Sequence, residues 1–406
     1  MTETLAMTQN ILEALAATNP DAEIWWDSSP LIYPSWKAET LAKAPAEKQA
    51  EWQEQLTRLY DAGTIHDSGT MGFRGVTTNP PLSLQAIKLA PELWAAEIKK
   101  IARDNPGLDV EGVYWAMYLD LVKKGASAIH PVFAKSGGKY AWLSGQVDPR
   151  FVADGDKMLA QGLSIAAQSD NVMVKLPGSK QGYEVLEELT ARGISTNNTT
   201  SFTVPQYLRC MAAVSAGLLR AKAADVDLSK WRSVITHMSA RLGELGDWKK
   251  EAAARGIELT LPEIRDGEEA VLKRAYHFGK SIGHPSKMLQ CSMRVEKDER
   301  TGKIVSRHIQ DFGGSDMVYT CPPSYIHQLM EAQEALGPFD PTAIDREPNR
   351  ASLEKLMKLP SFRQAYEFDG MTPDQFAQFG SFQATAGEFA AATRQTVDFV
   401  RMTLEG

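Results

Sequence analysis

The chain has few cysteines, and none of them belongs to a paired motif. Cys210, Cys291 and Cys321 are the only three in 406 residues, and they are far apart. The absence of Cys-x-x-Cys and the odd count exclude a disulfide framework and a cysteine-type zinc motif. We therefore expect a protein of a reducing compartment.

Long apolar runs and an excess of positive charge are also missing. No apolar run is long enough to span a bilayer, and residues 1–10 do not combine a basic region with an apolar one. The net charge is −7 and the pI is about 5.6, without a basic stripe. We expect a cytoplasmic protein that binds neither nucleic acid nor membrane. The sequence leaves a monomer and a homodimer open.

Motifs that hold cofactors or metals are lacking as well. There is no Gly-x-x-x-x-Gly-Lys-Ser/Thr loop, and Gly69, Gly72 and Gly75 are not spaced as a dinucleotide fingerprint. The seven histidines form no His-Glu-x-x-His motif, and no Gly-x-Ser-x-Gly elbow occurs. We expect no cofactor and no metal, so any catalysis would depend on the chain's own side chains.

What the sequence does contain is a regular alternation of apolar strands and amphipathic helices. The alternation predicts a parallel sheet with right-handed crossovers, and eight strand candidates predict a closed (β/α)8 TIM barrel. The candidates are residues 22–26, 73–77, 140–147, 171–177, 194–199, 231–236, 288–292 and 316–320.

We interpret residues 1–406 as a single barrel domain with additions. An N-terminal helix is expected at 7–17, and helices fill 82–102 and 110–124. Insertions are expected near 28–70, 243–286 and 295–312, the first with a charged helix at 47–60 and a Gly- and Ser-containing segment at 67–72. A C-terminal helical segment covers 350–406, with a long helix at 374–405.

One lysine stands out within the strand at 171–177. Lys175 lies between Val174 and Leu176, so it is poorly solvated, and desolvation disfavours the ammonium form. A neutral lysine amine is a nucleophile for carbonyl carbon, which makes Schiff-base formation available. A lysine that ends a strand and extends to water is the alternative, and it is the better interpretation of Lys175 taken alone.

Polar residues gather where the predicted strands end. In a barrel these carboxyl ends form one rim, where active sites are built. Each residue alone has an ordinary explanation, such as a turn cap for Asp27 or an Asn-Pro turn for Asn79. Their concentration on one rim favours a site. The residues are Asp27, Asn79, Gln146, Lys175, Asn197, Thr199, Thr236, Ser292 and Arg294.

Three ordered motifs carry a resemblance to a known family. The stretch 75–80, Gly-Val-Thr-Thr-Asn-Pro, resembles the transaldolase signature of the second strand. Residues 174–177, Val-Lys-Leu-Pro, followed by Asn197 and Thr199, resemble the region of the family's active-site lysine. Residues 146–150, Gln-Val-Asp-Pro-Arg, resemble its third-strand motif. The ordered set is much more specific than any single motif, and it is most similar to the longer bacterial transaldolases.

The resemblance implies catalytic roles for four residues. Lys175 would form the Schiff base with a ketose donor, and Asp27 would be the acid/base of carbon–carbon cleavage. Thr199 would hold a water that transfers protons, and Gln146 occupies the place of the residue that works with that water. The implied activity is that of a transaldolase, which transfers a dihydroxyacetone unit through the lysine.

The resemblance also implies which residues bind substrate. The implied substrates are sugar phosphates of the pentose phosphate pathway, fructose 6-phosphate or sedoheptulose 7-phosphate. Asn79 and Asn197 would bind hydroxyls of the three-carbon fragment, and Thr236 belongs to the same site. Arg241, Ser292 and Arg294 would hold the phosphate, for which arginine forks are well suited. A solvated helix charge is the alternative for Arg241.

The chain departs from the family pattern at several positions. Gln146 replaces the usual glutamate, and an amide cannot exchange a proton in the same way. Glutamine at this place resembles the fructose-6-phosphate-aldolase subgroup. Thr236 stands where serine is usual and Met238 where an aromatic residue is usual. His237 is either a core histidine, the favoured interpretation, or a substitute proton carrier.

These departures leave two other functions open. The first is a fructose-6-phosphate-aldolase-like enzyme, or a specialised transaldolase-like enzyme that acts on an unusual sugar. The second is a sugar-phosphate-binding barrel that has lost catalysis through Gln146. The exact sugar and the role of the insertions are not determined by the sequence.

Overall fold

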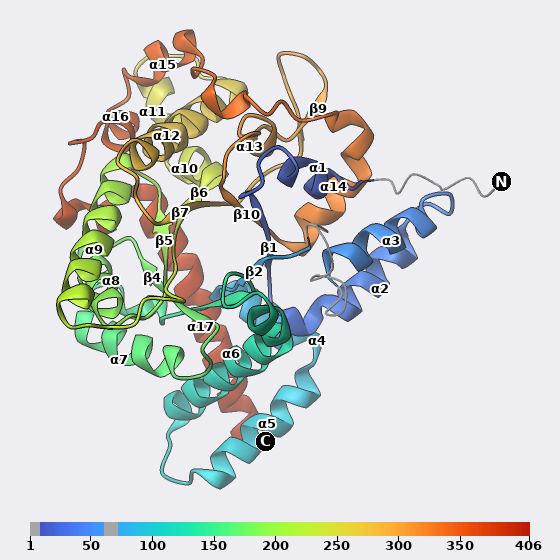
Figure 1. Cartoon of the computed structure of the whole chain (residues 1–406), viewed down its shortest axis with the longest axis vertical. Helices are drawn as coiled ribbons and strands as arrows, with labels where there is room; N and C mark the ends of the chain where they lie inside the picture. Colours follow the sequence, from blue (N-terminus) through green and yellow to red (C-terminus); the bar gives the residue numbers. More distant parts are fainter. Residues whose placement is uncertain (1–8, 61–71) are drawn as a thin grey trace.

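Eight parallel strands form a closed barrel at the centre of the molecule (Figure 1). The computed structural model describes residues 9–60 and 72–406. Around the barrel the strands follow the order β1-β10-β7-β6-β5-β4-β3-β2, so the predicted (β/α)8 barrel is confirmed. The strands are β1 (Glu23–Asp27), β2 (Gly75–Thr77), β3 (Trp142–Gln146), β4 (Val172–Pro177), β5 (Thr196–Ser201), β6 (Ser233–Met238), β7 (Lys287–Cys291) and β10 (Val318–Cys321).

The strand register sets polar residues side by side at one level. Gln146 of β3 pairs with Lys175 of β4, and Lys175 pairs in turn with Asn197 of β5. Residues paired across neighbouring strands point to the same face of the sheet. Pairing in the barrel therefore brings together three residues that are widely separated in sequence.

Strand β5 is unusual because it is polar and yet completely buried. Its sequence is Thr-Asn-Asn-Thr-Thr-Ser, and all six residues are buried. Buried polar groups are costly unless they form hydrogen bonds. Asn197 meets this need by donating from Nδ2 to Ser144 Oγ at 2.9 Å and accepting from Thr236 Oγ1 at 2.7 Å. Polar side chains therefore replace part of the apolar barrel core on this side.

The crossover helices expected at 82–102 and 110–124 both differ from their expected bounds. The single helix expected at 82–102 is two helices, because Pro91 has no N–H to donate and restricts the backbone of Ala90. The helix expected at 110–124 continues to Lys135. The helices around the barrel are α4 (Pro80–Leu89), α5 (Pro91–Asp104), α6 (Val110–Lys135), α7 (Gly155–Ala166), α8 (Lys180–Ala191), α9 (Val204–Ala223), α12 (Leu261–Ser281) and α14 (Pro323–Leu336).

Smaller elements occupy the ends and loops of the barrel. The N-terminal helix α1 (Ile11–Ala16) begins at the capping residue Asn10, and the expected residues Met7 and Thr8 lie outside the described residues, as do 61–71. Further elements are η1 (Pro30–Ile32), α2 (Tyr33–Lys43), α3 (Gln49–Leu59), η2 (Pro149–Phe151), α10 (Ser239–Leu245), α11 (Trp248–Ala254), the antiparallel pair β8 (Glu296–Lys297) and β9 (Ile304–Val305), α13 (Arg307–Gln310), η3 (Ala343–Asp345), α15 (Arg350–Leu356), α16 (Pro360–Tyr366) and η4 (Pro373–Gln378).

The last helix, α17 (Gly380–Glu405), passes across one end of the barrel. In Figure 1 it is the long red helix that runs from the C-terminus behind the strands. It packs against α4, α5, α6 and α10. The expected helix at 374–405 therefore begins six residues later, after the 3-10 turn η4. This path carries the middle of α17 past the strand ends, and the C-terminus lies beside α5 (Figure 1).

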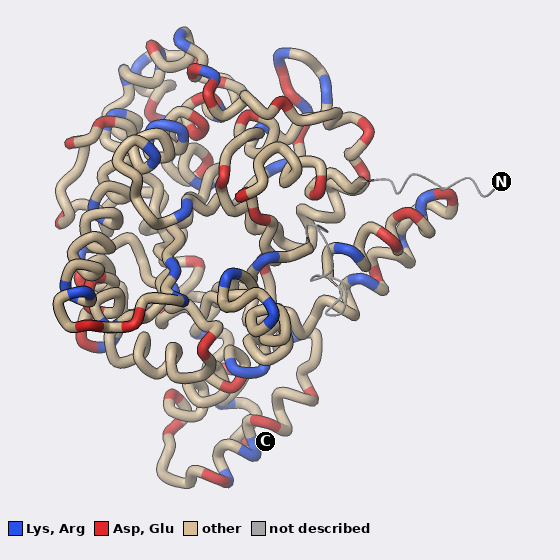
Figure 2. The backbone as a smooth tube through the Cα atoms, in the orientation of Figure 1, with Lys and Arg blue, Asp and Glu red and all other residues tan. Residues whose placement is uncertain are grey.

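Charges of both signs are distributed over the outer helices and loops. Figure 2 shows Lys and Arg interspersed with Asp and Glu along the backbone.

Within residues 9–60 and 72–406, no helix has the length and apolar content needed to cross a bilayer.

Candidate active site

A cavity of about 210 Å³ opens at the carboxyl ends of the barrel strands. Strands β1, β2, β4, β6, β7 and β10 each contribute a residue at or near their last position, and the loops and α17 complete the wall. The lining residues are Asp27, Thr77, Asn79, Pro81, Leu82, Lys175, Thr236, Met238, Arg241, Cys291, Ser292, Arg294, Thr320, Pro322, Glu388 and Phe389. Seven of the ten residues expected from the sequence therefore border one cavity.

Lys175 reaches the cavity from inside the barrel and is only 4% exposed. Its Nζ donates a hydrogen bond to the carbonyl oxygen of Thr78 at 2.9 Å. Burial lowers the pKa of Lys175 from its usual value, while the charges of Asp27 and Cys291 act in the opposite direction. The net shift favours the neutral amine, which is the nucleophilic form.

Asp27 ends β1 and shares the cavity with Lys175. Burial raises the pKa of Asp27, although Lys175, Thr77 and Arg241 oppose that shift. Thr77 Oγ1 donates to Asp27 Oδ1 at 2.7 Å, and Thr320 Oγ1 lies 2.5 Å from Thr77 Oγ1. Because the Thr77 hydroxyl donates its single proton to the Asp27 carboxylate, it can only accept a hydrogen bond from the Thr320 hydroxyl. This chain of hydroxyls fixes the orientation of the acid.

The shifts of Lys175 and Asp27 are complementary. Both side chains are buried, and both pKa values move toward the uncharged form. An amine and a carboxylic acid whose pKa values approach each other can exchange protons at little cost. The rim can therefore support nucleophilic attack by the amine together with acid/base catalysis by the carboxyl group.

Asn79 borders the cavity and has a structural role as well. It is the N-cap of α4, where its Oδ1 accepts from the backbone N–H of Leu82 at 3.0 Å. The turn expected for Asn-Pro is thus the start of a helix. The cap holds the side chain at the rim.

Asn197 does not line the cavity, but it is hydrogen-bonded to a residue that does. Thr236, which lines the cavity, donates to Asn197 Oδ1 at 2.7 Å. The Asn197 side chain is completely buried beside Lys175. Asn197 therefore supports the wall from behind in this structure.

Gln146 and Thr199 are also buried behind the cavity wall. The Oε1 of Gln146 and the Oγ1 of Thr199 have no hydrogen-bond partner among the described residues. Gln146 is the strand neighbour of Lys175, and Thr199 is the strand neighbour of Pro177. Unpaired buried acceptors are uncommon in folded proteins and often mark functional positions.

Arg241, Ser292 and Arg294 also line the cavity. Ser292 has a left-handed backbone conformation with φ of 58°, which is unfavourable for a residue other than glycine. Both arginines carry a carboxylate partner. Arg241 pairs with Glu388 of α17 at 2.6 and 3.0 Å, and Arg294 pairs with Glu244 at 2.8 Å.

His237 lies outside the cavity. Its Nδ1 faces the hydroxyl of Tyr207 on α9, and burial lowers the pKa of His237 to about 3. The ring is therefore neutral at physiological pH and buried in the layer between strand and helix. The next residue, Met238, points the other way and borders the cavity.

Several cavity residues did not emerge from the sequence. Thr77 and Thr320 lie at or near the carboxyl ends of β2 and β10, as the predicted site residues do on their own strands. Their positions at strand ends are therefore a signal in the sequence that predicts a place in the cavity. Cys291 is a buried thiol whose pKa burial raises to about 11, which keeps it neutral. Glu388 and Phe389 lie within a helix near the end of the chain, where no motif or strand end marks them.

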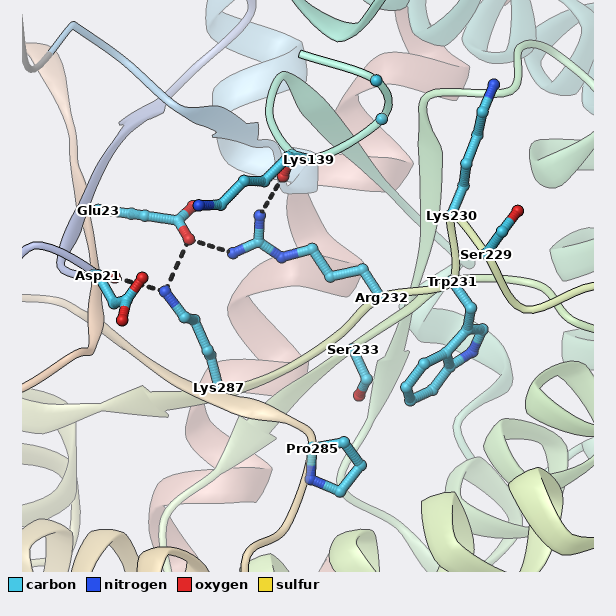
Figure 3. A pocket seen from close by; sticks show the side chains of 12 residues that line it. Asp21, Glu23, Lys139, Ser229, Lys230, Trp231, Arg232, Ser233, Pro285 and Lys287 are labelled. Carbon is cyan, nitrogen blue, oxygen red and sulfur yellow. Dashed lines mark hydrogen bonds and ion pairs between the residues drawn. The ribbon is translucent and has the colours of Figure 1, made fainter. Parts of the chain in front are cut away.

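A larger cavity of about 340 Å³ opens at the opposite end of the barrel (Figure 3). There the buried carboxylate of Glu23 accepts from Arg232 at 2.6 Å, from Lys287 at 2.8 Å and from Trp25 Nε1 at 3.0 Å. None of the residues expected at the active site lies in this cavity. In a TIM barrel the amino-end face generally contributes to stability rather than to catalysis.

The fold and the rim define a class: a parallel (β/α)8 barrel with a buried lysine and a buried carboxyl group in its carboxyl-end cavity. The model of one family, described as transaldolase/fructose-6-phosphate aldolase, matches residues 65–378. This match covers more than half of the 406 residues. The chain belongs to the transaldolase/fructose-6-phosphate aldolase family.

Individual relatives are similar at modest identity. Transaldolase 1 of Streptomyces avermitilis is 34% identical over 170 residues, which are 41% of this chain and 44% of the relative. The transaldolase of Thiobacillus denitrificans is 28% identical over 232 residues, 56% of this chain and 63% of the relative. Transaldolase 2 of Nostoc punctiforme is 24% identical over 302 residues, 68% and 78% of the two chains. In the first two cases the match spans less than two thirds of the relative.

Proposed function

We propose that the chain is a transaldolase, which transfers a dihydroxyacetone unit between sugar phosphates through a Schiff base on Lys175. The observation that carries the proposal is the buried Lys175 amine in the same cavity as the buried carboxyl group of Asp27. Fructose 6-phosphate and sedoheptulose 7-phosphate are the proposed donors. Membership of the family and the names of the relatives support the same activity.

The proposed reaction begins with attack of Lys175 Nζ on the ketone carbon of the donor. Loss of water gives an iminium ion, which withdraws electrons from the neighbouring carbon–carbon bond. Asp27 accepts the proton of the hydroxyl next to that bond as the bond breaks, and the first aldehyde leaves. The enamine that remains attacks a second aldehyde, and water then releases the new ketose from the lysine.

The remaining polar residues have supporting roles in this proposal. Asn79 and Thr236, which border the cavity, would bind the three-carbon unit, with Asn197 behind Thr236. Gln146 and Thr199, with their unpaired oxygens, would orient the water that enters and leaves. Arg241, Ser292 and Arg294 would bind the phosphate end of the substrate.

A fructose-6-phosphate-aldolase-like activity is the second candidate. It is favoured by Gln146, whose amide cannot act as the carboxylate that the family usually has beside the lysine. An aldolase releases the three-carbon unit to water instead of transferring it to an acceptor aldehyde.

The two functions differ in their dependence on an acceptor. The purified chain should release glyceraldehyde 3-phosphate from fructose 6-phosphate only when erythrose 4-phosphate is present, and Lys175→Met should abolish the release. Release that is independent of the acceptor would support the aldolase. Equal release by Lys175→Met and the original chain would contradict both.

A further inference from the structure

The phosphate end of the candidate site contains a carboxylate that faces an arginine directly. Glu388 of α17 accepts two hydrogen bonds from the Arg241 guanidinium, at 2.6 and 3.0 Å. Both side chains border the cavity that holds Lys175. The Glu388 side chain is 50% exposed, so it can leave this position without breaking the core.

The second arginine of the cavity is paired differently. Arg294 donates to Glu244 at 2.8 Å, but the same carboxylate also accepts from Arg265 at 2.9 Å. The charge of Glu244 is thus shared between two cations. The positive charge of Arg294 is therefore only partly neutralised by Glu244. Both terminal nitrogens of Arg241 instead donate to Glu388 alone among the carboxylates.

One face of α17 holds Arg241 in place independently of the carboxylate. Thr385, Glu388 and Phe389 are spaced three and four residues apart, so they project from the same side of the helix. The Thr385 hydroxyl lies 3.5 Å from Arg241 Nη1, and the Phe389 ring centre lies 5.8 Å from its guanidinium carbon. Thr385 and Phe389 are both buried. Neutralising Glu388 would therefore free the arginine fork without removing its support.

A phosphate and a carboxylate compete for the same guanidinium. Both prefer the two parallel N–H groups of the fork, and two anions close together repel each other. A sugar hydroxyl has no such conflict, because it can donate to a carboxylate and accept from a guanidinium at the same time. The Arg241–Glu388 pair therefore penalises a phosphate ester relative to an uncharged sugar end.

We infer that Glu388 is a specificity-determining residue that competes with the substrate phosphate for Arg241. A phosphate ester binds only after Glu388 has left the fork, whereas a sugar with a free terminal hydroxyl binds with the pair in place. The inference rests on the proposed function for the identity of the substrate, but the competition concerns only the anion and the arginine.

Binding of inorganic phosphate to the full chain tests the competition without any turnover. Isothermal titration should show that Glu388→Gln binds phosphate more tightly than the original chain by a factor of up to about five, since an ion pair of this exposure is worth up to about that factor. Asp398→Asn removes the same charge from the same helix, where Asp398 pairs with Arg401, and it should leave the affinity unchanged.

The opposite result has a clear structural meaning. If Glu388 instead aligns Arg241 for phosphate, Glu388→Gln will bind phosphate more weakly, which would overturn the inference. Equal affinity in the two proteins, or no phosphate binding by either, would overturn it as well. A Glu388→Ala variant serves as a second test if the glutamine keeps a hydrogen bond to the fork.

Kinetics separate this inference from the proposed function. With fructose 6-phosphate, Glu388→Gln should lower KM with kcat nearly constant, and with unphosphorylated fructose it should change neither. If the chain does not turn over these sugars, the proposed function fails, while the phosphate titration still decides the role of Glu388. A lower KM for both sugars would contradict the selective effect on phosphate.

Discussion

At the scale of single residues, burial determines the chemistry of the two central side chains. Desolvation is the largest influence on the pKa of both Lys175 and Asp27, and it moves them in opposite directions. Their mutual attraction works against this shift. Lys175 is therefore more nucleophilic than a surface lysine, while Asp27 holds its proton more firmly than a surface aspartate.

The substitution Asp27→Asn separates the two effects. It removes a negative charge that raises the pKa of Lys175, so that pKa should fall further and the neutral amine should persist to lower pH. The yield of ketose trapped on Lys175 by borohydride should be measured as a function of pH. In the variant, the acid limb of this profile should lie at lower pH than in the original chain. Turnover should fall by about 10²–10⁴-fold, because the proposed proton acceptor is lost. An acid limb that stays in place or rises would contradict this prediction.

A companion substitution should shift the same titration in the other direction. Gln146→Glu places a carboxylate on the strand neighbour of Lys175. A nearby negative charge favours the ammonium form, so the acid limb of trapping should move to higher pH. Opposite displacements in the two variants would show that electrostatics, not misfolding, causes them.

At the scale of elements, the strands could be predicted well and the helices less well. Apolar runs such as Val172–Val174 are typical of a buried parallel strand, and all eight strands were located within a few residues of their ends. The break between α4 and α5 was missed because the apolar pattern continues through Pro91. The polarity of β5 was not explained by its sequence, since the partners of Asn197 come from β3 and β6.

The contact between β1 and β2 depends on a glycine. A Cβ built on Gly75 would lie 2.4 Å from the Trp25 ring, so the two strands can only meet if this side chain is absent. Gly75→Ala should lower the free energy of unfolding by about 1–3 kcal/mol, as overpacking does in other cores. Urea unfolding followed by tryptophan fluorescence measures this change.

Gly107 provides the matched control for that substitution. A Cβ there would meet nothing within 4 Å, and its backbone is not left-handed. Gly107→Ala should therefore keep the unfolding midpoint of the original chain. Equal midpoints for the Gly75→Ala and Gly107→Ala variants would show that the close approach of Trp25 does not limit packing.

At the scale of the whole molecule, the barrel separates a charged amino end from a reactive carboxyl end. At the amino end, the buried Glu23 connects β1 with Arg232 next to β6 and with Lys287 of β7. Burial raises the pKa of Glu23 and is the largest single influence, but the two cations together lower it below its usual value. This cluster joins strands that are distant in the sequence.

Glu23→Gln should destabilise the fold in a pH-dependent way. A carboxyl group whose pKa is lowered by folding stabilises above its unfolded pKa of about 4.3, and this contribution is lost as pH falls through the lower folded value. The variant should lose about 1–3 kcal/mol at neutral pH, since its partners are partly exposed. Denaturant unfolding at pH 7 and below pH 4 should show the difference from the original chain shrinking in acid.

The surface pair of Glu354 and Arg350 is the control for this prediction. Both side chains are largely exposed, so Glu354→Gln should change stability little at either pH. A difference for Glu23→Gln that is constant with pH would contradict the role assigned to the buried cluster.

The candidate site could be predicted in outline because all strands of a parallel barrel end at one rim. Seven expected residues share the cavity for this reason. The pairing of Arg241 with Glu388 could not be predicted, because nothing in sequence indicates that a helix 147 residues further along the chain crosses the mouth. Gln146 and Asn197 lie at the same level of the barrel as Lys175 but have shorter side chains, and they and Thr199 are buried behind the cavity wall.

The most direct measurement is borohydride trapping of the full chain with fructose 6-phosphate, followed by peptide mass mapping. A covalent intermediate on a neutral lysine becomes a stable secondary amine on reduction. We expect a single adduct with the mass of a reduced three-carbon unit or of the whole ketose, located on Lys175 and absent from Lys175→Met. An unmodified Lys175, or an adduct on a different lysine in both proteins, would contradict the central claim.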